Sequence, residues 1–218
     1  MPLGEILAAA GIGTSAPLSE STIVAGLREA LTVGTERAVD VTSRRDGFYG
    51  NPRIRIPLPE SFERTASGMR SVGLGGLVDE LEISMNRAAE RAAAEATPVF
   101  VQAVREMTIQ DARGILSGSE RAATDYFQGR TRASLRQRFQ PIVEAGMQQV
   151  GLASLYANLV AQIARYPLLP QPRLNLSEHV TESALDGLFD VLAQEETRIR
   201  QDPVARTTEL LRQVFGGR

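Results

Sequence analysis

The longest uninterrupted helical pattern in the chain runs from Leu77 to Ala96. Its apolar side chains recur at steps of one, three and four residues, so they fall on one face of a helix. This stripe comprises Leu77, Val78, Leu81, Met85, Ala88, Ala89 and Ala92. A second face carries Asp79, Glu82, Asn86 and Glu90. The spacing predicts an amphipathic helix whose stripe other helices cover and whose polar line finds partners of its own.

Helical patterns fill most of the remaining chain. Small polar residues and proline at the first helical position begin helices, and glycine ends them. These signals predict further helices at about residues 5–10, 19–43, 60–71, 98–107, 109–117, 120–128, 131–150, 152–166, 182–200 and 203–215. We expect Gly129 to separate two helices and Pro141 to kink the second. The prediction is a single all-α domain of about ten helices over residues 19–218, after a linker or trimmed export-signal remnant at 1–18.

Residues 51–59, with the sequence NPRIRIPLP, form the only plausible β segment. Their apolar and polar side chains alternate, but three prolines deny the segment a full ladder of hydrogen bonds. We therefore expect an extended, proline-rich arm, or at most an edge hairpin.

Composition narrows the possible partners. The formal net charge of −2 argues against a nucleic-acid backbone as the main partner. All 24 positive side chains are arginine, which suits carboxylates and phosphates, although a biased genome composition explains the same count. The absence of cysteine excludes disulfides, thiol nucleophiles and thiolate metal sites. No stretch approaches the roughly 20 apolar residues of a transmembrane segment, so none is expected.

Metal and cofactor chemistry finds little support in the pattern. Asp79, Glu82, Asn86 and Glu90 offer the hard oxygen ligands that Mg²⁺ or Ca²⁺ prefers, but one straight helix does not converge them. A solvated or ion-paired face is the preferred interpretation. His179 is the only histidine, so His-pair metal sites are excluded, and we expect it to be a solvated surface residue. Neither a metal nor a cofactor is predicted.

One carboxylate falls on an apolar stripe. Glu196 lies four residues after Leu192 and three before Ile199, so it is expected to be partly buried and to need a cationic or hydrogen-bonding partner. The candidate partners are Arg87, Arg198, Arg200 and Arg206. Glu196 belongs either to a buried structural network or to the polar floor of a pocket.

Six glycines fall inside predicted helices, where each costs about 1 kcal/mol relative to alanine. They are Gly26, Gly34, Gly68, Gly114, Gly146 and Gly187. They mark either close helix crossings or room for a ligand between helices. A separate run of arginines, Arg130, Arg132, Arg136 and Arg138, has no acid until Glu144. It is either a solvated face or a positive patch that meets phosphate, headgroups or an acidic partner.

Several segments together resemble a known bacterial family, called domain of unknown function 4197, from Gly26 to Gly217. They are GLREALTVGTERAV (26–39), NPRIRIPLP (51–59), MNRAAE (85–90), ILSGSERAATDYF (115–127), ALDGLF (184–189) and EETRIRQDPVARTTELLRQVFG (195–216). The resemblance implies an exported protein of a Gram-negative bacterium whose precursor carries a signal or lipoprotein segment. The resemblance does not indicate which activity the chain has, and no catalytic residue can be inferred from it.

Three functions follow as hypotheses. The first is a periplasmic, non-enzymatic module that binds a hydrophobic or amphipathic small molecule. Its candidate ligand-binding residues are Asn86, Arg87, Glu90, Glu196, Arg198 and Arg206. The second is a scaffold that docks a protein of the cell envelope through the arm or through Arg130, Arg132, Arg136 and Arg138. The third is a hydrolase that uses Asp125, Tyr126 or Glu196. The oligomeric state is left open.

Overall fold

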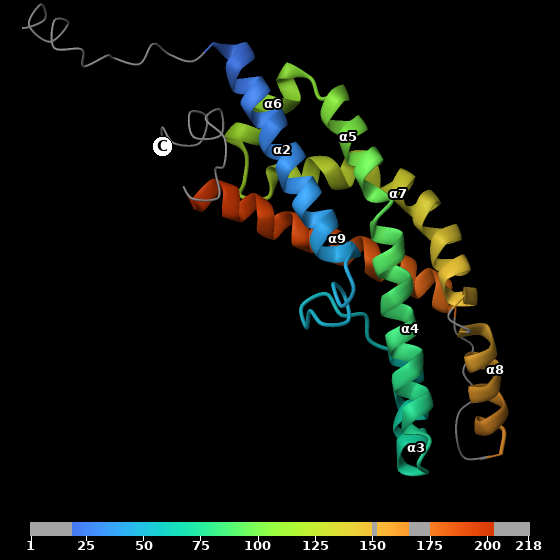
Figure 1. Cartoon of the computed structure of the whole chain (residues 1–218). Helices are drawn as coiled ribbons and strands as arrows, with labels where there is room; N and C mark the ends of the chain where they lie inside the picture. Colours follow the sequence, from blue (N-terminus) through green and yellow to red (C-terminus); the bar gives the residue numbers. More distant parts are fainter. Residues whose placement is uncertain (1–18, 150–151, 166–174, 203–218) are drawn as a thin grey trace, which may run out of the picture.

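The computed structural model describes residues 19–149, 152–165 and 175–202, and within these ranges it contains helices and no strand (Figure 1). The helices are α2 (Glu20–Ser43), α3 (Glu60–Ser71), α4 (Gly75–Ala93), α5 (Ala96–Glu106), α6 (Ile109–Ser117), α7 (Ala122–Gln149), α8 (Leu152–Ile163) and α9 (Leu176–Gln201). The all-α prediction is confirmed. The helices predicted at 5–10 and 203–215 lie outside the described residues.

The described residues form fewer helices than the ten or so predicted. The segments 120–128 and 131–150 are one helix, α7, which passes through Gly129 and contains Pro141. Gly129 does not end the helix, and it does not adopt the positive φ of a terminating glycine. Figure 1 shows α7 bending along its length. Helix α9 begins earlier than predicted, because the side chain of Asn175 accepts a hydrogen bond from the Glu178 backbone N–H and caps it.

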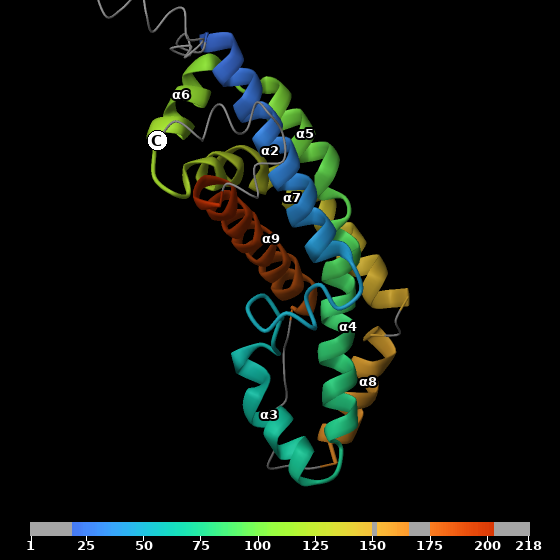
Figure 2. The ribbon, with the colours of Figure 1, turned by 60° about the vertical axis from the view of Figure 1, so that its left-hand side comes forward.

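Helix α9 lies at the centre of the arrangement. It packs against α2, α4 and α7, and Figures 1 and 2 show these helices crossing one another. At one end of the molecule α4 continues beyond this crossing and lies beside α3 and α8 (Figure 2). Helices α5 and α6 lie toward the other end, where both contact α2 and α7. The fold is therefore an elongated assembly in which α4 joins the two ends.

The apolar stripe of the helix now labelled α4 is buried as predicted, apart from the partly buried Leu77. Five phenylalanines fill the core around it without exposed surface: Phe48, Phe62, Phe100, Phe127 and Phe139. Phe100 meets Phe127 edge to face, with ring centroids 5.4 Å apart, the arrangement that aromatic quadrupoles favour. One hydrophobic core therefore connects helices that are far apart in the sequence.

The prediction of a proline-rich arm was wrong. Residues 44–59 connect α2 to α3 without a strand, and Ile54, Ile56 and Leu58 bury their side chains in the core. Arg53 and Arg55, which alternate with Ile54 and Ile56, remain at the surface, which accounts for the alternation in the sequence. The segment does not project because its apolar side chains gain more from burial than an extended arm in water would allow.

Two glycines in helices are expected to respond to alanine in opposite directions. A Cβ on Gly187 lies 2.6 Å from Cε1 of the fully buried Phe48, whereas a Cβ on Gly129 meets no atom within 4 Å. We expect Gly187→Ala to lower the free energy of unfolding by about 1–3 kcal/mol through overpacking. Gly129→Ala is expected to raise it by about 0.5–1 kcal/mol through helix propensity. Urea denaturation of both variants measures the effects, and a destabilising Gly129→Ala contradicts the continuous α7.

Candidate functional site

The polar face of α4 holds the segment that connects α2 to α3. Asn86 is fully buried, and its Oδ1 accepts from the Ile56 N–H while its Nδ2 donates to the Ile56 carbonyl oxygen, both at 2.9 Å. One turn further along, Oε1 of Glu90 accepts from the backbone N–H groups of Phe48 and Tyr49 at 3.2 and 3.3 Å. These two side chains supply hydrogen bonds that a neighbouring strand would otherwise provide.

Arginines complete this network. Arg87 donates to Oε2 of Glu90 at 2.7 Å and to Oδ1 of Asp46 at 2.6 Å. Burial lowers the pKa of Arg87, but its hydrogen bonds to these two carboxylates outweigh burial and leave the pKa above its ordinary value. The other two acids of the predicted line are ion-paired, Glu82 with Arg55 at 2.7 Å and Asp79 with Arg70 at 3.3 Å. The oxygens considered as metal ligands are thus engaged by arginines and backbone groups.

Glu196 of α9 binds the N-terminus of α7. Its Oε1 accepts from the Ala123 N–H at 3.0 Å, and its Oε2 accepts from the N–H and the hydroxyl of Thr124, both at 2.8 Å. Arg200, one turn later, donates to Oε1 through Nε and Nη2 at 3.0 and 2.8 Å. A carboxylate at a helix N-terminus satisfies donors that the helix itself leaves free and complements its dipole.

The predicted ligand-binding residues therefore do not form one site. Asn86, Arg87 and Glu90 contact the segment 46–56, whereas Glu196 contacts α7 and Arg200. Arg198 lies at the surface with Nη1 3.6 Å from Oε1 of Glu195, and Arg206 lies outside the described residues. The cavity beside Glu196 measures about 30 Å³, about the space of one water molecule.

The predicted arginine patch is divided among partners. Arg132 and Arg136 pair with Glu182 of α9 at 2.7 and 2.9 Å. Arg130 lies 3.9 Å from Asp111, and its guanidinium lies 5.8 Å from the ring centroid of Tyr126. Arg138 is exposed and has no ion pair or hydrogen bond from its side chain within the described residues. Two of the four arginines, Arg130 and Arg138, therefore keep most of their hydrogen-bonding capacity for another molecule.

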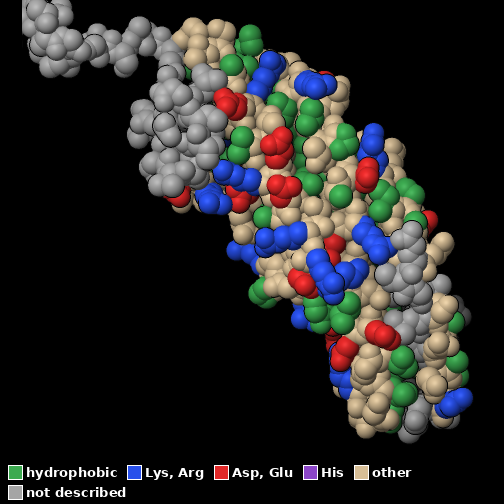
Figure 3. All heavy atoms as spheres, viewed as in Figure 1, with side chains coloured by type: hydrophobic (Ala, Val, Ile, Leu, Met, Phe, Trp, Pro, Cys, Tyr) green, Lys and Arg blue, Asp and Glu red, His purple; other side chains and the backbone are tan. Residues whose placement is uncertain are grey.

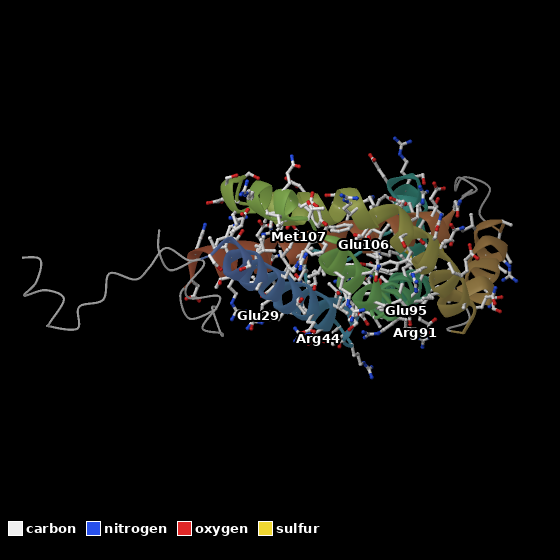
Figure 4. The ribbon with its side chains drawn as sticks, turned by 90° about the horizontal axis from the view of Figure 1, so that it is seen from above. Glu29, Arg44, Arg91, Glu95, Glu106 and Met107 are labelled. Carbon is white, nitrogen blue, oxygen red and sulfur yellow. The ribbon has the colours of Figure 1, made fainter. Side chains whose placement is uncertain are left out.

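Those two arginines line a groove between α5 and α7 with a volume of about 300 Å³. We call it the α5–α7 groove, and its lining residues are Pro98, Val99, Gln102, Ala103, Glu106, Tyr126, Arg130, Thr131, Ser134 and Arg138. Figure 4 labels Glu106 and its neighbour Met107 at the end of α5. Glu106 accepts a hydrogen bond from Gln102 at 2.5 Å, and the Tyr126 hydroxyl donates to the Ala103 carbonyl oxygen at 3.3 Å.

The groove carries charges of both signs. Arg130, Arg138 and Glu106 belong to its lining, and Asp111 lies beyond the lining, 3.9 Å from Arg130. Hydrogen bonds from the backbone and side chain of Thr108 lower the pKa of Asp111. Burial first, and the nearby charge of Asp111 second, raise the pKa of the Tyr126 phenol, so it stays neutral at pH 7. The groove thus combines apolar surface with arginine charge.

The residues considered for hydrolysis do not share contacts. Asp125 is exposed, the Tyr126 hydroxyl donates to a carbonyl oxygen, and Glu196 is held by Arg200 and α7. Nε2 of the partly exposed His179 lies 2.9 Å from the Pro57 carbonyl oxygen. In the part of the chain that the structure describes, no group of three acidic or histidine side chains is placed to hold a metal ion.

Asp46 and Arg53 take part in polar networks that the sequence did not indicate. Asp46 binds Arg87, which is 41 positions away, and Arg53 binds Asp190 at 2.7 Å across 137 positions. The hydrogen bond to Arg53 is the main cause of the lowered pKa of Asp190. Arg200, by contrast, was among the candidate partners of Glu196, because residues four apart on a helix are neighbours.

Comparisons with known proteins give one match. The model of a protein family described as "Protein of unknown function (DUF4197)" matches residues 17–216, nearly the whole chain. Neither a curated protein nor a solved structure matches the chain. Over the residues that the structure describes, none of the helices combines the length and the apolar character needed to cross a membrane.

Proposed function

We propose a function for this chain, which belongs to the DUF4197 family, from the geometry of its α5–α7 groove: it is a non-enzymatic module that binds a small amphipathic anion. The observation that carries the proposal is the pairing of Arg130 and Arg138 with an apolar wall in a groove of about 300 Å³. This volume is at the lower end of the roughly 300–1,000 Å³ typical of small-molecule sites. The cavity beside Glu196 is an order of magnitude smaller.

The groove suits a ligand that has a charged group and an apolar body. A carboxylate would accept hydrogen bonds from the guanidinium groups of Arg130 and Arg138, whose planar forks match it. An apolar body would lie along Val99, Ala103 and the ring of Tyr126, which line the same groove. The arginines fix the orientation of the ligand, and the apolar wall contributes affinity in proportion to the area that it buries.

The periplasm is our proposed location, and it rests on the resemblance to exported proteins. A scaffold that docks through the segment 51–59 receives no support, because Ile54, Ile56 and Leu58 are buried. The large hydrophobic side chains that are exposed in the described residues, Val72 and Ile109, belong to different parts of the chain, at the end of α3 and the start of α6.

Titration with decanoate tests the groove. Isothermal calorimetry is expected to show saturable binding of one decanoate per chain, and acetate is expected to bind far more weakly because it lacks the apolar body. The double variant Arg130→Gln with Arg138→Gln should weaken decanoate binding by at least about tenfold, the value of roughly one lost charge-assisted contact.

Arg105→Gln is the matched control, since Arg105 is an exposed arginine of α5 that does not line the groove. Its affinity for decanoate should equal that of the unchanged protein. The proposal fails if decanoate does not bind, if the double variant binds as well as the unchanged protein, or if acetate and decanoate bind equally.

A further inference from the structure

A second concave surface lies between α9, the residues that lead into α7 and the segment 44–59. Its volume is about 450 Å³, and three arginines line it: Arg53, Arg121 and Arg198. Gln194, Thr197 and Glu120 complete its polar lining. We call it the three-arginine hollow. In Figure 3, arginine side chains gather over the region where Figure 1 places α9 and the connection from α2 to α3.

The arginines keep most of their donors unused. A guanidinium offers five N–H donors. Arg53 commits Nε and Nη2 to Asp190 at 2.7 and 3.3 Å, and Arg198 has an ion pair with Glu195 at 3.6 Å without a hydrogen bond. The guanidinium of Arg121 has no hydrogen bond or ion pair within the described residues. Three guanidinium groups from separate parts of the chain therefore line one hollow, and each has N–H donors that are not engaged.

The neutral groups of the hollow are already engaged. Nε2 of Gln194 donates to Asp190 at 2.9 Å, and the Thr197 hydroxyl donates to the Ala193 carbonyl oxygen at 3.0 Å. Glu120, the one acid in the lining, accepts from Gln201 at 3.3 Å. Within the lining the arginines outnumber the acid by three to one, while Asp190 and Glu195 pair with Arg53 and Arg198.

We propose that the three-arginine hollow binds a phosphoryl group. One guanidinium fork can already satisfy the two oxygens of a carboxylate. Three forks instead suit a tetrahedral group with at least three acceptor oxygens and a charge of up to about −2. The phosphoryl group belongs either to a soluble phosphate compound or to a phospholipid headgroup, and the experiment separates these sources.

This hollow is independent of the α5–α7 groove. The two share no lining residue, and they are built on different helices apart from α7, whose start borders the hollow. A failure of decanoate binding therefore does not contradict the phosphoryl site, and a failure of phosphate binding does not contradict the α5–α7 groove.

Titration of the whole chain with inorganic phosphate, followed by NMR of the backbone amides, is the direct test. Saturable shifts are expected at residues 193–198, and sodium acetate at the same ionic strength should not reproduce them. Arg121→Gln and Arg198→Gln should each weaken phosphate binding by about tenfold. Both arginines are exposed, so thermal unfolding should be nearly unchanged in these variants.

Arg105→Gln, which removes an exposed arginine that lines neither the hollow nor the α5–α7 groove, is the control and should bind phosphate like the unchanged protein. The proposal is overturned if phosphate causes no saturable shift, if acetate produces the same shifts, or if Arg105→Gln weakens binding as much as Arg121→Gln.

Vesicles then identify the source of the phosphoryl group. Sedimentation with phosphatidylglycerol vesicles, but not with phosphatidylcholine vesicles, together with loss of sedimentation in Arg121→Gln, assigns the hollow to a lipid headgroup. Phosphate binding without sedimentation supports the site and assigns it to a soluble phosphate compound. Sedimentation that Arg121→Gln does not reduce contradicts a role for the hollow at membranes.

Discussion

Replacing Glu196 with alanine is expected to lower the free energy of unfolding by about 3–5 kcal/mol, the usual cost of breaking a buried ion pair by removing one partner. The variant deprives the Ala123 N–H, the Thr124 N–H and the Thr124 hydroxyl of their acceptor. It also removes the carboxylate that Arg200 contacts at 2.8 Å. Chemical denaturation monitored by circular dichroism measures the loss.

Asp186→Asn on the same helix is the matched control. Asp186 is exposed and pairs with Arg132 at 2.7 Å, and surface pairs of this kind contribute roughly 0–1 kcal/mol. If Glu196→Ala destabilises the protein no more than Asp186→Asn does, the anchoring role of Glu196 at the start of α7 is refuted. Glu196→Gln should fall between the two, because the amide keeps one acceptor but loses the charge.

The second large effect is expected at Asn86. Asn86→Ala leaves both the N–H and the carbonyl oxygen of Ile56 without their partner in a buried environment. Each buried polar group left unsatisfied costs about 1–3 kcal/mol, so we expect a total loss of about 2–6 kcal/mol. Denaturation measures the total, and faster hydrogen exchange of the Ile56 amide reports the local change.

A control for this prediction is Asn51, which lies in the same connecting segment as Ile56. The side chain of Asn51 accepts one hydrogen bond from the Arg53 N–H at 3.1 Å near the surface, so Asn51→Ala should cost at most about 1 kcal/mol. Equal losses of unfolding free energy for Asn51→Ala and Asn86→Ala would contradict the predicted contribution of the Ile56 hydrogen bonds to stability.

Local periodicity predicted much of the fold. The stripe of α4 and the stripe of α9 that includes Glu196 are buried because helical spacing alone determines which side chains share a face. The same rule predicted that Glu196 needs a partner and put Arg200 within reach. Gly129 was misjudged, since glycine permits a positive φ without requiring one.

Contacts between distant residues could not be predicted in this way. Nothing in the sequence near Asn86 or Glu90 identifies Ile56, Phe48 or Tyr49 as partners, because a side chain that binds a backbone N–H or carbonyl leaves no mark on the identity of the residue bound. The polar line of α4 therefore resembled a solvated face, although Asn86 and Glu90 are buried.

The candidate sites show the same division. Arg130 and Arg138 were singled out because they lie close together in the sequence, but their groove also needs Val99 and Ala103 from α5. The three-arginine hollow draws on positions 53, 121 and 198, which only the tertiary structure brings together. A charged site whose residues come from separate segments cannot be predicted from the pattern within any one segment.

The central place of α9 has a consequence for biosynthesis. Helices α2, α4 and α7 pack against α9, which follows all three in the chain. A ribosome therefore completes most of the apolar faces of this protein before it makes the helix that covers them, and exposed apolar surface on a nascent chain promotes aggregation. We infer that stable packing of α2, α4 and α7 waits until α9 is available to cover them.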